Sequence, residues 1–135
     1  MKKKRIYWII GIASFILICN LPPLRMLFDY GFDLHHYQYT NFNGEFYKRT
    51  SGPYDYYMAT GSYESFLKST NPKPVDTTLY RTFWRNPLAF WRYYSYFGKQ
   101  YSFPYISENE IRENQKKYPV KNPFPPGLNP FADYR

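Results

Sequence analysis

The stretch HHYQYTNFNGEFYKRT, residues 35–50, places Asn43-Gly44 between two runs that carry aromatic rings. Asn-Gly in this setting is a strong hairpin signal, because a type I′ turn needs positive φ at both central residues. It predicts antiparallel strands over 36–42 and 45–50, with Phe42 opposite Glu45. One face would carry Tyr37, Tyr39, Asn41, Phe46 and Lys48, and the other Phe42 and Tyr47. Neither face is wholly apolar, so we expect the hairpin to pack on a partner surface.

Short helical and extended segments follow the hairpin. SYESFLKST, residues 62–70, predicts two helical turns with Ser62 as N-cap, ended by the Asn-Pro-Lys-Pro stretch at 71–74. Residues 77–85 are expected to be extended. Further on, Ser107 and Glu110 have the spacing of a capping box that opens a charged helix. That helix should end with Lys116 and Lys117, and its exposed face should be solvated.

The densest aromatic stretch is RNPLAFWRYYSYFGKQY, residues 85–101. Asn86 suits an N-cap, Pro87 the first helical position and Gly98 the position after the last turn, which predicts a helix over 87–97. Only Arg92 and Tyr96 interrupt its apolar surface. A helix that is apolar around most of its circumference is buried, or is covered by another molecule.

The N-terminus reads MKKKR followed by the uncharged run IYWIIGIASFILICNL, residues 6–21. A basic cluster before such a run is typical of a signal peptide or an uncleaved signal anchor. As a helix the run measures ~24 Å, short for a hydrocarbon core of ~30 Å unless residues 22–28 extend it. Four cations precede the run and only Arg25 lies close after it. By the positive-inside rule the N-terminus is cytoplasmic and the rest is exported, as in a single-pass protein of the bacterial inner membrane.

Cys19 lies near the end of this run and is the only cysteine of the chain. Lipidation of a cysteine at this place needs a small residue before it, and the preceding residue is Ile18. Ala13-Ser14 lies too early for a cleavage site of small residues. We therefore expect an uncleaved anchor with a free thiol. The exported part then has no internal disulfide, so packing or a partner must order it.

The net charge is +8, of which residues 1–28 supply +5 and the remaining chain +3. Residues 29–135 contain 28 aromatic residues but only nine Leu, Ile or Val. Such a chain builds a thin core of rings, and its stability alone is marginal. The predicted fold is one N-terminal transmembrane or signal-anchor helix (1–28), a small aromatic-rich α+β body of hairpin and short helices (29–118), and an extended Pro-rich arm (119–135).

The sequence offers little chemistry. Single-strand nucleic-acid binders combine rings with a cationic groove, but a charge of +3 and export both disfavour nucleic acid as a partner. Adjacent His35 and His36 would point to opposite faces of a strand, so with Asp29 and Asp33 they make a poor metal site. No nucleophile–base pattern, paired-carboxylate motif or phosphate loop is present in the sequence. We expect no cofactor and no enzymatic activity.

These features predict an accessory or structural subunit of a larger cell-envelope complex, anchored in the bilayer and bound to other subunits. Aromatic side chains most often supply interface energy. The residues expected to contact partners are Trp84, Phe90, Trp91, Tyr94 and Phe97 in the body and Phe124 and Phe131 in the arm. Two alternatives remain open: a free-standing anchored module that binds cell-wall glycan or another exported ligand, and an envelope enzyme.

Overall fold

The computed structural model describes residues 2–32, 37–50, 52 and 55–120. Two compact units divide the chain, and the first is discontinuous in sequence. It comprises Met1–Leu34 with Arg85–Phe97, whereas the second comprises His35–Trp84 with Gly98–Arg135. We call the first the anchor unit, after the predicted signal anchor that it contains, and the second the body. The predicted division at residues 28 and 118 stays a prediction.

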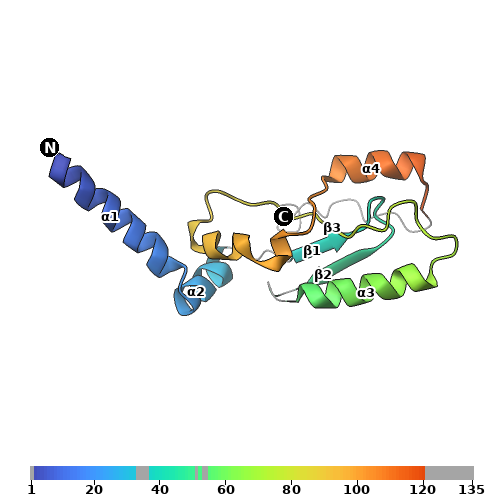
Figure 1. Cartoon of the computed structure of the whole chain (residues 1–135), viewed down its shortest axis with the longest axis horizontal. Helices are drawn as coiled ribbons and strands as arrows, with labels where there is room; N and C mark the ends of the chain where they lie inside the picture. Colours follow the sequence, from blue (N-terminus) through green and yellow to red (C-terminus); the bar gives the residue numbers. More distant parts are fainter. Residues whose placement is uncertain (1, 33–36, 51, 53–54, 121–135) are drawn as a thin grey trace. The chain divides into compact units, whose positions relative to one another are not determined.

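Two helices begin the anchor unit: α1, Lys2–Cys19, and α2, Pro22–Phe32. Both prolines of Pro22-Pro23 stand in the first turn of α2, where a missing N–H is tolerated. They start a new helix instead of extending the old one, and the axes of Lys3–Cys19 and Pro22–Phe28 differ by 83° (Figure 1). Residues 22–28 therefore do not extend the apolar run as one straight helix.

No single helix among the described residues is both long and apolar enough to cross a bilayer alone. The pair Lys3–Cys19 and Pro22–Phe28 passes the same test of length and composition when taken together. Signal sequences near an N-terminus have this length and composition too.

The third element of the anchor unit is the 3₁₀ helix η1, Phe90–Phe97. The predicted α-helix over 87–97 is thus wrong in type and in start, because its first carbonyls are taken by other donors. The Asn86 carbonyl accepts from the Ala89 N–H at 3.1 Å and from the Tyr96 hydroxyl at 2.6 Å. The Pro87 carbonyl accepts from the Tyr93 hydroxyl at 2.6 Å. An α-helix would need these carbonyls for the N–H groups four residues on.

The body is an α+β structure around a three-stranded antiparallel sheet in the order β2-β1-β3. The strands are β1, Tyr37–Thr40, β2, Tyr47–Thr50, and β3, Tyr80–Arg81. In the first pair, Tyr37 lies opposite Thr50 and Thr40 opposite Tyr47. This is the register that follows from placing Phe42 opposite Glu45, so the predicted register is confirmed. Within the predicted extended segment 77–85, only β3 is a strand.

The hairpin connection differs from the predicted type I′ turn. Gly44 has φ 72°, and no non-glycine residue in the described part of the chain has positive φ, so Asn43 does not adopt it. The Gly44 N–H instead donates to the Asn41 carbonyl at 3.3 Å. The Asn41 side-chain oxygen accepts from the Phe46 N–H at 3.1 Å and takes the place of a ladder bond. The strands therefore end before residue 41 and a wider loop joins them.

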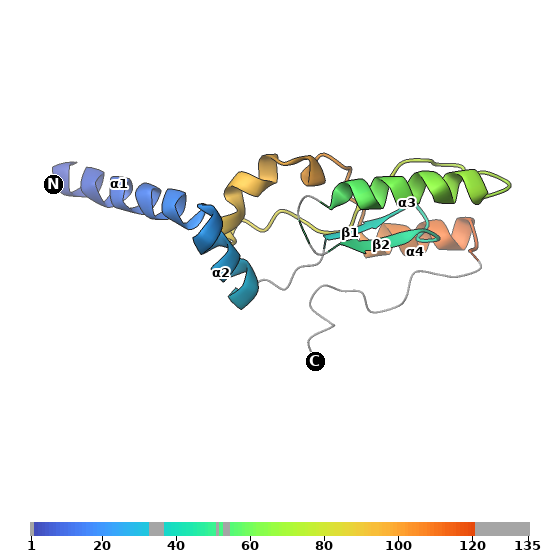
Figure 2. The same ribbon diagram turned by 90° about the horizontal axis from the view of Figure 1, so that it is seen from below.

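Helix α3, Tyr56–Ser69, lies beside β2 (Figures 1 and 2). Helix α4, Glu108–Lys117, lies on the β3 side of the sheet in Figure 1. Ser62 lies inside α3 and is not its N-cap, because the helix begins earlier, at Tyr56. The earlier start lets Ala59 and Tyr63, one turn apart, share the buried face of the helix. The predicted capping box of α4 is confirmed: the Ser107 hydroxyl accepts from the Glu110 N–H, and the Glu110 carboxylate accepts from the Ser107 N–H at 2.8 Å.

Rings form the core of the body, as the composition predicts. Tyr39 meets Phe83 and Phe103 edge-on, with both ring centroids 5.4 Å away. Beside α3, Phe46 lies 4.9 Å from Tyr63. Every residue of β1 is buried, because β1 is the central strand. The hairpin thus finds the partner surface it requires within its own unit.

Candidate interaction surfaces

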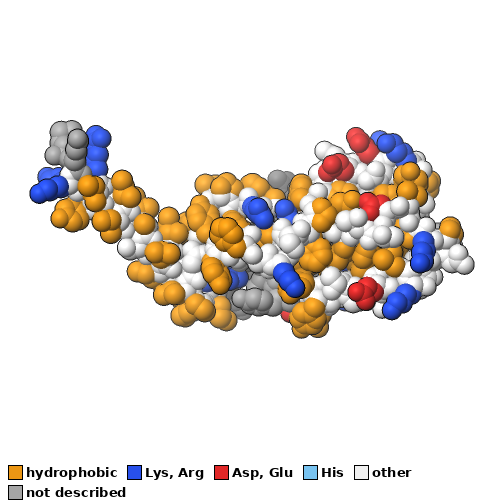
Figure 3. All heavy atoms as spheres, in the orientation of Figure 1, with side chains coloured by type: hydrophobic (Ala, Val, Ile, Leu, Met, Phe, Trp, Pro, Cys, Tyr) orange, Lys and Arg blue, Asp and Glu red, His pale blue; other side chains and the backbone are white. Residues whose placement is uncertain are grey.

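Apolar side chains cover α1 on every side. Five consecutive residues, Ile6 to Ile10, are exposed, and Trp8 is 75% exposed. Consecutive residues in a helix point ~100° apart, so five of them surround the axis. Lys3, Lys4 and Arg5 are exposed at the N-terminal end, and the hydrophobic surface follows (Figure 3). The helix is therefore shaped for apolar surroundings beyond a charged end.

One side of α1 carries an open hollow of about 470 Å³. Lys4, Tyr7, Trp8, Gly11, Ile12 and Phe15 line it. No atom lies near the position that a Cβ on Gly11 would occupy, so this glycine leaves a notch between larger side chains. A site for a small molecule encloses most of its ligand. All residues that line this hollow belong to one helix, so it does not enclose a ligand. Its shape suits a lipid chain or a neighbouring helix better than a small molecule.

Residues 86–97 pack against the end of α1 and the start of α2. The Phe90 ring lies 5.8 Å from Phe15 and 6.1 Å from Phe28. The Trp91 ring stacks on Phe28 at 5.5 Å, with 22° between their planes. Two of the residues expected to bind partners, Phe90 and Trp91, thus contact the chain's own anchor unit.

Asn20, between α1 and α2, holds this segment by both ends of its side-chain amide. Its Nδ2 donates to the Phe90 carbonyl at 2.8 Å, and its Oδ1 accepts from the Tyr94 N–H at 3.0 Å. Nδ2 also donates to the Ile16 carbonyl at 2.8 Å. An amide with two donors and an acceptor can make all three bonds at once. Asn20 is therefore a polar clip inside an apolar unit.

Beyond the clip, the burial of residues 86–97 differs from the predicted one. Leu88, Tyr94 and Phe97 are 81%, 73% and 91% exposed, whereas Arg92, expected to interrupt the apolar surface, is buried at 5%. The 3₁₀ helix has three residues per turn, so its sides carry other residues than those of the predicted α-helix would. Tyr94 and Phe97 lie three residues apart on one side of it. They make an exposed apolar edge.

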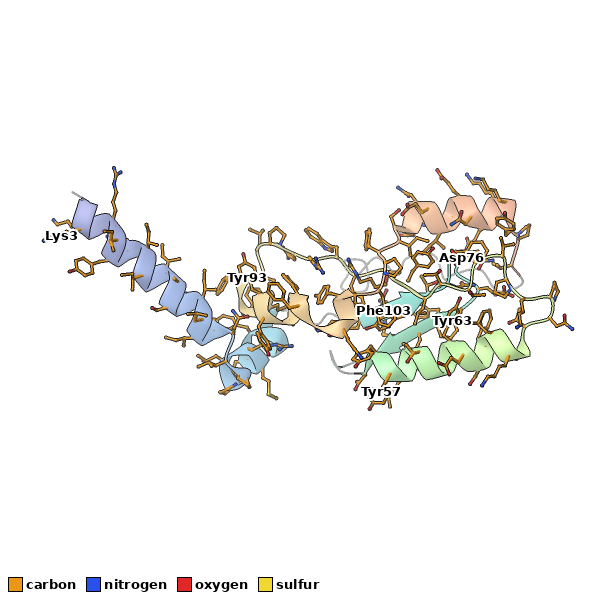
Figure 4. The ribbon with its side chains drawn as sticks, in the orientation of Figure 1. Lys3, Tyr57, Tyr63, Asp76, Tyr93 and Phe103 are labelled. Carbon is orange, nitrogen blue, oxygen red and sulfur yellow. The ribbon has the colours of Figure 1, made fainter. Side chains whose placement is uncertain are left out.

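In the body, large exposed hydrophobic side chains lie on α3 and on two connecting segments. Tyr57 and Met58, at the start of α3, are both exposed, and Tyr57 points away from the sheet while Tyr63 points toward it (Figure 4). The predicted contact residue Trp84 is 45% exposed, and Tyr105 is exposed too. Sequence reasoning missed Tyr57 and Met58 because it began the helix too late. The helical spacing of Ala59 and Tyr63 would have placed them outside.

Titratable groups of the body serve its structure. Burial raises the pKa of Tyr63 to about 12, with Asp76 adding to the effect. Burial opposes ionisation of Asp76, but hydrogen bonds from Tyr80 and Thr78 outweigh it and hold its pKa below the usual value. The Tyr80 hydroxyl donates to Asp76 at 2.7 Å, which raises the pKa of Tyr80. These three groups keep their usual charge at neutral pH. A general acid or base needs a pKa near the working pH, and their shifts lead away from it.

Arg81 is enclosed by rings and backbone oxygen atoms. Its guanidinium lies 5.3 to 5.8 Å from the centroids of Phe83, Tyr101 and Tyr105. Its Nε donates to the Phe103 carbonyl at 3.0 Å. Arg81 thus joins β3 to the segment before α4 through cation–π contacts and a hydrogen bond, and its role is structural.

Within residues 2–32, 37–50, 52 and 55–120, no group of three or more His, Cys, Asp or Glu gathers to hold a metal ion. His35, His36 and Asp33 lie outside the described residues, as do Phe124 and Phe131 of the predicted arm. Comparison of the chain with protein-family models, curated proteins and solved structures finds no match.

Proposed function

We propose that this protein is a non-catalytic accessory subunit of a larger cell-envelope complex, held by a single-pass anchor in the bacterial inner membrane. The observation that carries the proposal is the apolar surface surrounding α1 directly after Lys3, Lys4 and Arg5. Soluble monomers rarely expose a continuous apolar surface of this kind. The surface needs a bilayer or a protein neighbour to cover it.

The charges at the two ends of α1 support one orientation. The basic cluster forms the first turn of α1, and Arg25 in α2 is the next cation in the sequence. By the positive-inside rule this difference keeps the N-terminus cytoplasmic and carries the body to the other side. The 14 residues of α1 after Arg5 measure ~21 Å, less than the ~30 Å of a hydrocarbon core, so part of α2 would have to complete the crossing.

Contact with other subunits is proposed for the aromatic surfaces outside the anchor. Tyr57, Met58 and Trp84 are exposed in the body. Aromatic residues and methionine are enriched where proteins bind one another. The Pro-rich arm, with Phe124 and Phe131, would lie extended along a neighbour, since proline-rich segments keep an extended form at low entropic cost.

The anchor is tested by washing native membranes with high salt and then with carbonate, which removes peripheral proteins. We expect the protein to stay in the membrane fraction, and replacing both Ile9 and Ile12 with Asp to release it or prevent its insertion. Val75→Asp, at another exposed apolar position, is the matched control and should leave the protein membrane-bound. Release of the unchanged protein by carbonate would refute the anchor.

The subunit role is tested by mild-detergent extraction from the native membrane, followed by sizing and identification of co-migrating proteins. We expect a large particle with partners in fixed ratio. Substitution of Tyr57 and Met58 by Ser should reduce the amount of partner recovered, whereas Val75→Ser should not. A well-folded monomer that runs alone would overturn this role. The exposed rings would then be tested for glycan binding, the alternative function.

A further inference from the structure

Residues 86–97 are attached to the part of α1 that the proposed orientation places furthest from the basic cluster. Phe15 and Asn20, which hold the segment, lie ten and fifteen residues after Arg5. At 1.5 Å per residue these are ~15 Å and ~22 Å along the helix. With Arg5 at the inner headgroups of a ~30 Å core, Phe15 lies near the middle of the core and Asn20 in its outer half, about 8 Å from the outer boundary.

The anchor is shorter than the hydrocarbon core, so a further apolar element at this depth would help to cover the difference. After Arg5, α1 continues for 14 residues, or ~21 Å, before the chain bends by 83°, and this length is several Å less than the core. A short span deforms the bilayer unless flanking groups cover the difference. Leu88, Tyr94 and Phe97 are exposed on the segment that packs against this end of α1. The exposed Met26 and Leu27 of α2 belong to the same unit.

The hydrogen bonds of the segment suit an environment that supplies little water. Polar backbone groups in or near hydrocarbon must be paired within the protein. The Phe90 carbonyl and the Tyr94 N–H are paired with Asn20, and the carbonyls of Asn86 and Pro87 with tyrosine hydroxyls. Water could pair these groups on an aqueous surface without such an arrangement.

The composition of the segment fits the boundary between hydrocarbon and headgroups. Residues 85–97 contain two arginines, three tyrosines and one tryptophan, and no acidic residue. Tyrosine and tryptophan concentrate at this level because each has an apolar ring and a polar atom.

We infer that residues 86–97 are a second membrane-contacting element, which inserts Leu88, Tyr94 and Phe97 at the outer interface of the bilayer. The inference rests on the proposed membrane anchor, and it assigns Tyr94 and Phe97 to lipid where the sequence predicted a protein partner. The occupant is the lipid itself, because the segment that carries these exposed side chains packs on the apolar helix α1 within one compact unit.

The test places a single fluorescent label at chosen positions of the full chain in lipid vesicles. Cys19 is first replaced by Ala, and Cys is then introduced at Leu88, Phe97, Ile9 or Val75, each in a separate variant. The labelled proteins are reconstituted in phosphatidylethanolamine and phosphatidylglycerol vesicles that contain a nitroxide lipid. Quenching by the nitroxide reports lipid contact, and quenching by iodide reports contact with water. Ile9 is the reference for the anchor and Val75 for the aqueous body.

We expect the labels at Leu88 and Phe97 to resemble the label at Ile9, with several-fold stronger nitroxide quenching and weaker iodide quenching than at Val75. If they resemble Val75 while Ile9 is in lipid, the second membrane-contacting element is refuted and the anchor stands. If Ile9 resembles Val75 too, the anchor is refuted, and the inference with it. Circular dichroism of each variant, compared with the unlabelled chain, verifies that the label has not unfolded the protein.

Discussion

Replacing Ile111 with Val and with Ala should destabilise the body in two measurable steps. Ile111 is the one buried residue of α4, with 1% of its surface exposed. Around it, the Asn114 side chain donates to the Phe42 carbonyl at 2.9 Å, and the Tyr118 ring lies 5.4 Å from that of Phe42. Ile111 is therefore the principal apolar contact by which α4 is held to the body.

The size of each step follows from the carbon atoms removed. Ile111→Val deletes one methyl group and should cost about 1 kcal/mol of unfolding free energy. Ile111→Ala deletes three carbons, worth ~2.4 kcal/mol at ~0.8 kcal/mol for each buried methylene. A cavity adds to this cost, and the better helix propensity of Ala returns ~0.4 kcal/mol. We expect about 3 kcal/mol in total.

The assay is urea unfolding of the full chain in dodecyl maltoside micelles, followed by near-ultraviolet circular dichroism of the packed tyrosines. Glu113→Ala, at an exposed position of the same helix, is the control and should change the unfolding free energy by less than ~0.5 kcal/mol. An Ile111→Ala cost below ~1 kcal/mol, or one equal to the control, would refute the packing of α4 described above. Ile111→Val keeps the test informative if the Ala variant does not fold.

Four other outcomes can be measured in the same micelles. Ser107→Ala removes a cap bond of α4 and should cost about 1 kcal/mol in urea unfolding, whereas Ser107→Asp, which can still cap, should restore most of it. Gly44→Ala should cost ~1 kcal/mol because φ is 72° there, and an unchanged urea midpoint would contradict the turn. Burial raises the pKa of Tyr63 from 10.0 to about 12, so the native state holds this proton more tightly than the unfolded state. Its contribution to stability is then complete below pH 10 and is lost as the pH rises to 12; a Tyr63→Phe variant should lose less over that range. Asn20→Leu removes the side chain that pairs with the Phe90 carbonyl and the Tyr94 N–H. A loss of ~2 kcal/mol would speed hydrogen exchange of the amides in residues 90–97 by ~30-fold, and unchanged exchange would argue against the clip.

Local signals in the sequence predict the parts of this fold that depend on neighbouring residues. The capping box of Ser107 and Glu110 is one, since both bonds are made within three residues of each other. The hairpin register is another, because the pairing of one residue fixes that of all others in the two strands. The end of α3 before residues 71–74 also follows from local prolines.

The errors arise where a distant or unexpected hydrogen-bond partner competes with the local pattern. The side chain of Asn41 replaces the tight turn that Asn43-Gly44 favours. Tyrosine hydroxyls take the carbonyls of Asn86 and Pro87 and prevent an α-helix there. Propensity alone does not reveal such competition, because a tyrosine hydroxyl lies far from its own backbone.

The candidate surfaces were harder to predict than the fold. Aromatic residues are used for cores and for interfaces alike, so their presence does not separate the two. Phe90 and Trp91 pack against α1 and α2, and this contact joins residues some seventy positions apart. The exposure of Tyr94 and Phe97 depends on the 3₁₀ geometry of η1. Their role as partner-binding residues stays a prediction, as does that of Trp84, Phe124 and Phe131.

The discontinuity of the anchor unit has a consequence for how the protein is made and how it could be shed. A ribosome completes residue 34 about fifty residues before residue 85, a delay of roughly 3–10 s at 5–20 residues per second. Over that interval the newly made α1 and α2 lack the segment that covers Phe15 and Phe28. In the proposed membrane-bound state, a protease that cuts the chain once after Leu34 would leave the body joined to α1 and α2 through residues 85–97. Release of the body requires that this second attachment also be broken.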